Sequence, residues 1–189
     1  MGIVMVTGGA RSGKSTYGEQ LAKVRGGNIA YIATAIVTDK DMEDRVKKHR
    51  KSRPQEWLTI ERYKGFDNID RDIVMSTDLF LLDCITTMVT NLMFDKDINY
   101  DTCSNEDIQM VEEYVFGEVK KLLDFMESNN KEIILVTNEV GMGLVPAYRL
   151  GSIFRDIAGR INQYVASRAD EVYFMVSSIP MKIKGADKG

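Results

Sequence analysis

The chain has 189 residues, of which 44% are hydrophobic, and it carries a formal net charge of −3 at pH 7. A chain of this length and composition can form one globular domain with a full core. This slightly negative net charge is unlike the positive charge by which proteins bind nucleic acid or an anionic membrane, so neither partner is expected.

Short apolar runs alternate with helix-forming segments along the chain, and no linker or internal repeat divides it. The apolar runs predict strands over residues 3–7, 29–34, 58–62, 79–83, 133–137 and 172–176. The segments between them predict helices over residues 13–24, 39–50, 86–93, 106–128 and 153–168, while the pattern fades between residues 63 and 76. We therefore expect a single α/β domain over residues 1–189, with a mostly parallel sheet flanked by helices and ligands at the carboxyl ends of its strands.

The first predicted strand leads into a complete G-x-x-x-x-G-K-[ST] phosphate loop, whose residues are Gly8, Gly9, Ala10, Arg11, Ser12, Gly13, Lys14 and Ser15. In such a loop, backbone N–H groups converge on phosphate oxygens, the lysine supplies a cation, and the last hydroxyl binds Mg²⁺. The alternative is a simple glycine-rich turn. Because a strand precedes this loop and a helix follows it, the sequence predicts a P-loop nucleotide site.

The predicted strand over residues 79–83 ends in Asp83, in the manner of a Walker B strand. An apolar strand of this kind delivers a carboxylate to the edge of the sheet, where it can hold Mg²⁺ directly or through water. The alternative is an aspartate that merely ends a strand. Cys84, which follows, is expected to be a small buried residue rather than a nucleophile.

Several features bear on the location of the protein. Cys84 and Cys103 are the only cysteines and show no metal-binding or disulfide spacing, which favours the reducing cytoplasm. The N-terminus has no basic region of the kind that opens a secretory signal. The longest apolar stretch, residues 79–94, contains Asp83 and polar Thr and Asn side chains, so no membrane span is expected.

The only histidine, His49, lies in the helix predicted over residues 39–50. Met42 and Val46 form an apolar pair four residues apart, and His49 follows on the same face, so it points toward the protein. A partly buried structural histidine is one interpretation. The other is a nucleophile that forms a phosphoramidate with an α-phosphate, because nearby cations favour the neutral imidazole. These cations are Arg45, Lys48, Arg50 and Arg53.

A series of motifs follows in a fixed order over nearly the whole chain. They are Tyr31-Ile32-Ala33-Thr34-Ala35, Arg45-Val46 with His49-Arg50 and Arg53-Pro54, Trp57 with Thr59 and Glu61, Leu81-Leu82-Asp83-Cys84-Ile85-Thr86, Thr137-Asn138-Glu139-Val140-Gly141, Phe154-Arg155-Asp156, and Ala169-Asp170-Glu171-Val172. In order and spacing they resemble the bifunctional adenosylcobinamide kinase and adenosylcobinamide-phosphate guanylyltransferase family of cobalamin biosynthesis. One departure is Ser178, where that family would have glycine.

The resemblance implies a RecA-like fold and two reactions. The first is phosphorylation of adenosylcobinamide, a corrinoid, by a nucleoside triphosphate, ATP or GTP. The second is transfer of GMP from GTP to the product, with His49 as the guanylylated residue and Lys14 as a second catalytic group. The family's nucleotide contacts fall on Gly8, Gly9, Ala10, Arg11, Ser12, Gly13, Lys14, Ser15, Ala33, Thr34, Ala35, Arg50, Lys51, Ser52, Arg53, Glu61 and Asp83.

Physical roles can be given to several of these residues. Lys14, Arg50 and Arg53 would offset phosphate charge, and Ser15 and Asp83 would position Mg²⁺. Glu61 would accept a guanine N–H, or else it is an acid that closes a strand.

The resemblance also implies a homo-oligomer, of which a trimer is one candidate form. Four arginines recur along the last predicted helix, and one could reach the phosphates of a neighbouring subunit, although surface ion pairs are the simpler interpretation. They are Arg149, Arg155, Arg160 and Arg168.

Two alternative functions stay open. One is a single-activity small-molecule kinase that keeps His49 as a structural residue. The other is a nonenzymatic module whose loops order on nucleotide binding. A regulatory GTPase is disfavoured because the N-K-x-D guanine motif is absent, its nearest match being Asn138-Glu139-Val140-Gly141.

Overall fold

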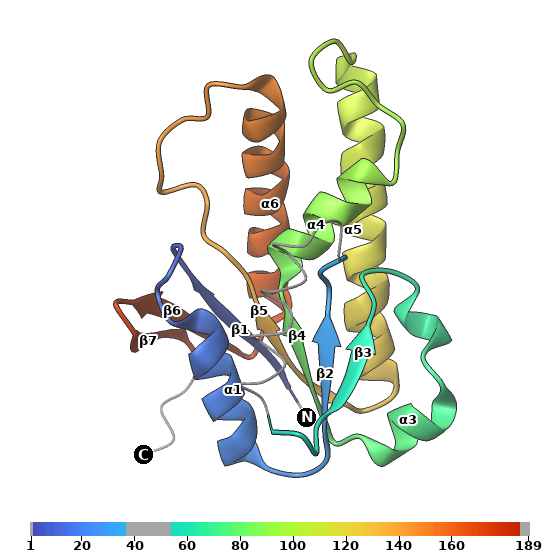
Figure 1. Cartoon of the computed structure of the whole chain (residues 1–189), viewed down its shortest axis with the longest axis vertical. Coiled ribbons are helices and arrows are strands. Elements are labelled where there is room, and N and C mark those ends of the chain that lie inside the picture. The colour runs from blue at the N-terminus through green and yellow to red at the C-terminus, as the bar shows by residue number, and fades with distance from the viewer. Residues whose placement is uncertain (1, 37–53, 186–189) are drawn as a thin grey trace.

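The computed structural model describes residues 2–36 and 54–185, and its centre is a seven-stranded sheet of order β3-β2-β4-β5-β1-β6-β7 (Figure 1). All neighbouring strands are parallel except β6 and β7, which are antiparallel. The strands are β1 (Ile3–Gly8), β2 (Ile29–Ala33), β3 (Leu58–Glu61), β4 (Leu79–Asp83), β5 (Glu132–Val136), β6 (Glu171–Val176) and β7 (Ile179–Lys184).

Helices cover both faces of the sheet (Figure 1). They are α1 (Lys14–Arg25), the 3₁₀ helix η1 (Phe66–Asn68), α3 (Arg71–Ser76), α4 (Ile85–Phe94), α5 (Asn105–Ser128) and α6 (Arg149–Arg168). Side chains alternate along β1, so Ile3 and Met5 join the larger core with α4, α5 and α6. Val4 and Val6 pack on the other face against α1. The sequence-based prediction of a mostly parallel α/β sheet flanked by helices is confirmed.

The predicted strands are all present, with ends that differ by at most one residue. The predicted helices outside residues 37–53 are also present, although α6 begins at Arg149 and not at residue 153. The helix predicted over residues 39–50 lies outside the described residues. Among the described residues, no helix has the length and apolar character needed to cross a membrane.

Two parts of the fold were missed. The segment over residues 63–76, left without an element, contains η1 and α3, and Asp70 caps α3 by accepting a hydrogen bond from Asp72 N at 2.8 Å. Both elements are too short for a periodic pattern to show. The second omission is β7, where Pro180 lowers strand propensity and the antiparallel return lies at a sheet edge that tolerates proline.

The turn between β6 and β7 explains the one departure from the family pattern. Val176 pairs with Ile179, so Ser177 and Ser178 form a two-residue hairpin loop. Their φ angles are 50° and 68°, both in the left-handed region that the favoured hairpin turn requires. Glycine adopts this region without steric cost, which is why glycine is expected at Ser178.

Three of the four arginines of α6 are engaged within the chain. Arg149 donates to the carbonyls of Tyr100 and Cys103. The other two form ion pairs: Arg160 with Glu112, and Arg168 with Asp124 and Glu127. For Arg160 and Arg168 the interpretation as surface ion pairs is confirmed, whereas Arg149 bonds to backbone carbonyls.

Candidate active site

The phosphate loop joins the carboxyl end of β1 to the first turn of α1. Gly13 caps α1 in the left-handed conformation, with φ 91°. A Cβ atom on Gly13 would lie 2.8 Å from Ser178 Oγ, and one on Gly8 would lie 2.6 Å from the carbonyl oxygen of Met175. The two glycines of the motif are therefore needed both for backbone conformation and because β6 and its turn approach so closely.

Lys14 lies across this loop. Its side chain is buried, with 7% of the residue exposed, and its Nζ donates to the carbonyl of Gly9 at 2.6 Å. Burial lowers the pKa of Lys14, and the nearby Asp83 carboxylate opposes that effect. The Lys14 ammonium is buried and its charge is only partly offset, so an anionic ligand stabilises it strongly. The loop is therefore suited to bind phosphate oxygens.

Strand order places Asp83 near the loop but not beside it. β5 lies between β1 and β4, and Asp83 pairs with Val136, the last residue of β5. Strands are about 4.8 Å apart, which leaves roughly 10 Å between the ends of β1 and β4. That gap is the size needed for phosphate groups and a hydrated cation.

The donor set at this edge fits Mg²⁺. The predicted ligands are the Ser15 hydroxyl in the first turn of α1 and the Asp83 carboxylate at the end of β4. Within the described ranges no group of three or more His, Cys, Asp or Glu side chains could hold a metal by itself. Mg²⁺ usually keeps several waters and takes one or two protein ligands together with substrate phosphates, so a sparse set is the fitting one.

Residues 33–35 leave the sheet next to Asp83. Ala33 pairs with Asp83, and Thr34 is 1% exposed. The Thr34 hydroxyl donates to the carbonyl of Cys84 at 2.8 Å and accepts from its N–H at 2.9 Å, while Asn91 donates to the Thr34 carbonyl at 2.7 Å. Thr34 therefore locks the ends of β2 and β4 together, and its contact with a nucleotide stays a prediction.

Glu61 ends β3, the edge strand, and pairs with Ala33. It is exposed at the same carboxyl edge, two strands beyond Asp83. The remaining predicted contacts lie outside the described residues. They are His49, Arg50, Lys51, Ser52 and Arg53.

The end of β5 belongs to this edge and was not among the predicted site residues. Glu139 N donates to the carbonyl of Gly8 at 2.9 Å, so the chain after β5 lies directly against the phosphate loop. Asn138 donates to the Thr86 hydroxyl at 2.6 Å, and Thr137 donates to Asn162 at 2.7 Å. The signal in the sequence is a Thr-Asn-Glu run directly after an apolar strand.

Cys84 has the character expected of a structural residue. Its Sγ lies 3.1 Å from the hydroxyls of Thr86 and Thr87. Burial and the adjacent Asp83 raise the pKa of the thiol, which keeps it protonated and unreactive.

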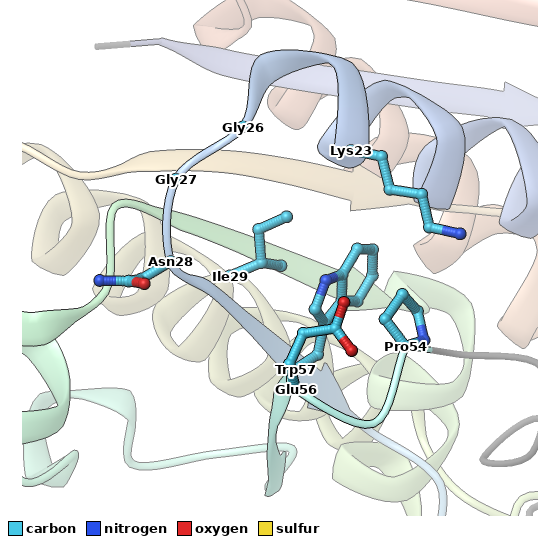
Figure 2. A pocket seen from close by; sticks show the side chains of 8 residues that line it. All are labelled: Lys23, Gly26, Gly27, Asn28, Ile29, Pro54, Glu56 and Trp57. Carbon is cyan, nitrogen blue, oxygen red and sulfur yellow. The ribbon is translucent and has the colours of Figure 1, made fainter.

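A cavity of about 420 Å³ lies elsewhere, at the C-terminal end of α1 (Figure 2). It is lined by Lys23, Gly26, Gly27, Asn28, Ile29, Pro54, Glu56 and Trp57. The phosphate loop is at the opposite end of α1, about 18 Å away for a helix of 12 residues. This cavity is therefore separate from the predicted nucleotide site.

Comparisons with known proteins identify the family of this chain. Residues 4–183 match the family model described as cobinamide kinase / cobinamide phosphate guanyltransferase. The chain is 43% identical to the bifunctional adenosylcobalamin biosynthesis protein CobU of Escherichia coli K12, over 96% of this chain and 99% of that protein. It is 42% identical to CobU of Salmonella typhimurium LT2, with the same coverage, and 36% identical to CobP of Pseudomonas aeruginosa, over 96% of both chains. The chain therefore belongs to the cobinamide kinase / cobinamide phosphate guanyltransferase family.

Proposed function

We propose that this protein phosphorylates adenosylcobinamide with ATP or GTP and then transfers GMP from GTP to the phosphorylated product. The observation that carries the proposal is a complete phosphate loop facing a Walker B aspartate, in a chain that matches a kinase and guanyltransferase family over residues 4–183. We further propose that the protein acts in the cytoplasm as a single-domain protomer of a homo-oligomer.

The first reaction is a phosphoryl transfer. The oxygen of the aminopropanol hydroxyl attacks the γ-phosphorus, the bond to the bridging oxygen breaks, and the nucleoside diphosphate leaves while the hydroxyl proton is released. Such transfers depend mainly on positioning and on charge stabilisation. Lys14 and the backbone N–H groups of the loop would supply both, because they converge on the phosphates.

The second reaction is a nucleotidyl transfer in two steps. An imidazole nitrogen of His49 attacks the α-phosphorus of GTP, the α–β phosphoanhydride bond breaks, and pyrophosphate leaves. A phosphate oxygen of the corrinoid then attacks the same phosphorus, the P–N bond breaks, and adenosylcobinamide-GDP is released. This role for His49 is supported by the family match.

Mg²⁺ would be held by Ser15, Asp83 and the substrate phosphates. When bound, it neutralises charge on the phosphate oxygens. The Asp83 carboxylate would hold the ion from the end of β4, and the Ser15 hydroxyl would hold it from the first turn of α1.

Of the two alternatives, the nonenzymatic module is not supported, because the family consists of enzymes. The single-activity kinase differs from the proposal in one respect: it never carries a covalent nucleotide.

The test is incubation of the protein with GTP labelled at the α-phosphate, in the presence of Mg²⁺. We expect label on the protein that is labile to acid and stable to base, as a phosphoramidate is, and we expect His49→Asn to abolish it. GTP labelled at the γ-phosphate is the matched control and should leave no guanylyl label, because that phosphorus departs in pyrophosphate. A variant that labels as well as the parent would show that His49 is not the nucleophile.

A further inference from the structure

The hairpin turn between β6 and β7 touches the phosphate loop. The N–H of Ser178 donates to the carbonyl of Ser12 at 2.9 Å. The contact is close, because a Cβ atom on Gly13 would meet the Cα of Ser178 at 3.1 Å. Residues 177 and 178 therefore pack against the side of the phosphate loop, although they are distant from it in the sequence.

The hydrogen bond fixes the orientation of one peptide group. A trans peptide is planar, and its C=O and N–H point in opposite directions. When the Ser12 carbonyl points outward to Ser178, the N–H of Gly13 must point the other way, into the concave side of the loop. That is the direction in which a phosphate loop presents its N–H groups to phosphate oxygens.

The β6–β7 hairpin, whose turn contacts the loop, is itself held in place. Glu171, at the start of β6, accepts from Arg25 of α1 at 2.7 Å and pairs with Lys182 of β7 at 3.3 Å. Met175 of β6 pairs with Gly8 at the end of β1. The turn is therefore tied to α1 and to β1, the two elements that the phosphate loop connects.

We infer that Ser178 is a positioning residue for nucleotide binding, acting through its backbone N–H and not through its hydroxyl. It holds the Ser12–Gly13 peptide with the Gly13 N–H facing a bound di- or triphosphate. This inference rests on the proposed nucleotide site and deepens it.

The decisive variant replaces the amide of Ser178 by an ester in the full-length chain, which removes the N–H and keeps the side chain. We expect the dissociation constant for ADP, measured by calorimetry with Mg²⁺, to rise about three- to tenfold, the usual effect of one hydrogen bond. The matched control is the same ester at Ser177, whose N–H has no hydrogen bond in the described part of the chain. It weakens the same turn and should leave ADP binding within about twofold of the parent.

Ser178→Gly separates the backbone role from the side chain. It keeps the N–H and removes the strain of a left-handed serine, so ADP should bind as tightly as to the parent while the melting temperature rises. Equal ADP binding by the Ser178 ester and the parent would overturn the inference, and so would a loss of binding in Ser178→Gly. If the parent itself bound neither ADP nor GDP, the proposed nucleotide site would fall, which is a distinguishable result.

Discussion

At the scale of single residues, the site is organised around a buried cation. Lys14 is held by the Gly9 carbonyl inside the loop, where burial lowers its pKa and Asp83 partly restores it. Among the residues that the structure describes, Lys14 Nζ bonds only to neutral groups of the loop, the Gly9 carbonyl and the Ser12 hydroxyl. The energetic gain from ligand binding is therefore concentrated on one side chain.

Lys14→Ala should reduce both proposed reactions by at least about a hundredfold, which is the usual effect of removing a main stabiliser of developing charge. If one phosphate-binding loop serves both reactions, kcat/KM should fall by similar factors in the kinase and guanylyltransferase assays. Lys23→Ala is the control, because Lys23 is an exposed lysine of the same helix. Loss of the kinase activity alone would instead indicate separate nucleotide positions for the two reactions.

At the scale of elements, a capping box at the N-terminus of α5 fixes where this long helix begins. α5 starts with a reciprocal capping box: Asp107 N donates to Ser104 Oγ at 3.1 Å, and Ser104 N donates to Asp107 Oδ2 at 2.9 Å. The buried face of α5 then packs into the core with Val111, Val115 and Val119. A local cap thus sets the register of a helix that covers a large part of the sheet.

Ser104→Ala should lower the free energy of unfolding by about 1 kcal/mol, because it leaves an N–H of the first turn without its acceptor. Urea titration followed by circular dichroism measures this, with an unchanged denaturant slope. Ser128→Ala is a suitable control at the other end of α5, since both bonds of that hydroxyl are exposed: it donates to the carbonyl of Phe125 at 3.1 Å and accepts from Asn129 Nδ2 at 3.4 Å. We expect a change below about 0.5 kcal/mol for the control, and an equal loss in both variants would argue against the cap.

At the scale of the whole molecule, one ion-pair network ties distant segments together. Arg25 at the end of α1 bonds Glu132 of β5 and Glu171 of β6. Burial alone would raise the pKa of Glu171, but hydrogen bonds from Tyr173 and Arg25 outweigh it and lower the pKa to about 2. The network joins the far end of α1 to the strands on either side of β1.

Acidification should therefore weaken the fold through Glu171. Because the folded pKa is depressed below the ordinary 4.5, the stabilisation is complete above about pH 4.5 and is lost as the pH falls toward 2. The loss is about 3 kcal/mol at most. Urea midpoints measured between pH 5 and pH 3 should fall more steeply for the parent than for Glu171→Gln, whose side chain cannot titrate. Parallel pH profiles would show that the network adds no net stability.

Local patterns in the sequence identified most of the fold and the centre of the site. Strands β1 to β6 were predicted because each is a short apolar run between turn signals, and the phosphate loop because glycine, lysine and serine must stand at fixed spacing. Strand β7, which contains Pro180, was not predicted. Asp83 was placed correctly at the end of β4 because it closes such an apolar run, and its role as a Mg²⁺ ligand stays a prediction. The short elements η1 and α3 were missed because a helix of one or two turns leaves no period to detect.

The sequence by itself therefore determined the α/β class, the family and the residues of the phosphate loop. Strands, helices and the loop show as short local patterns, and the family shows in the order of such patterns along the chain. Only the tertiary structure decided that β5 separates the loop from Asp83, that Glu139 lies against Gly8, and that the N–H of Ser178 donates to the Ser12 carbonyl. The last two of these contacts join residues more than a hundred positions apart. They depend on how the strands are ordered and how closely backbones approach, which no local pattern encodes.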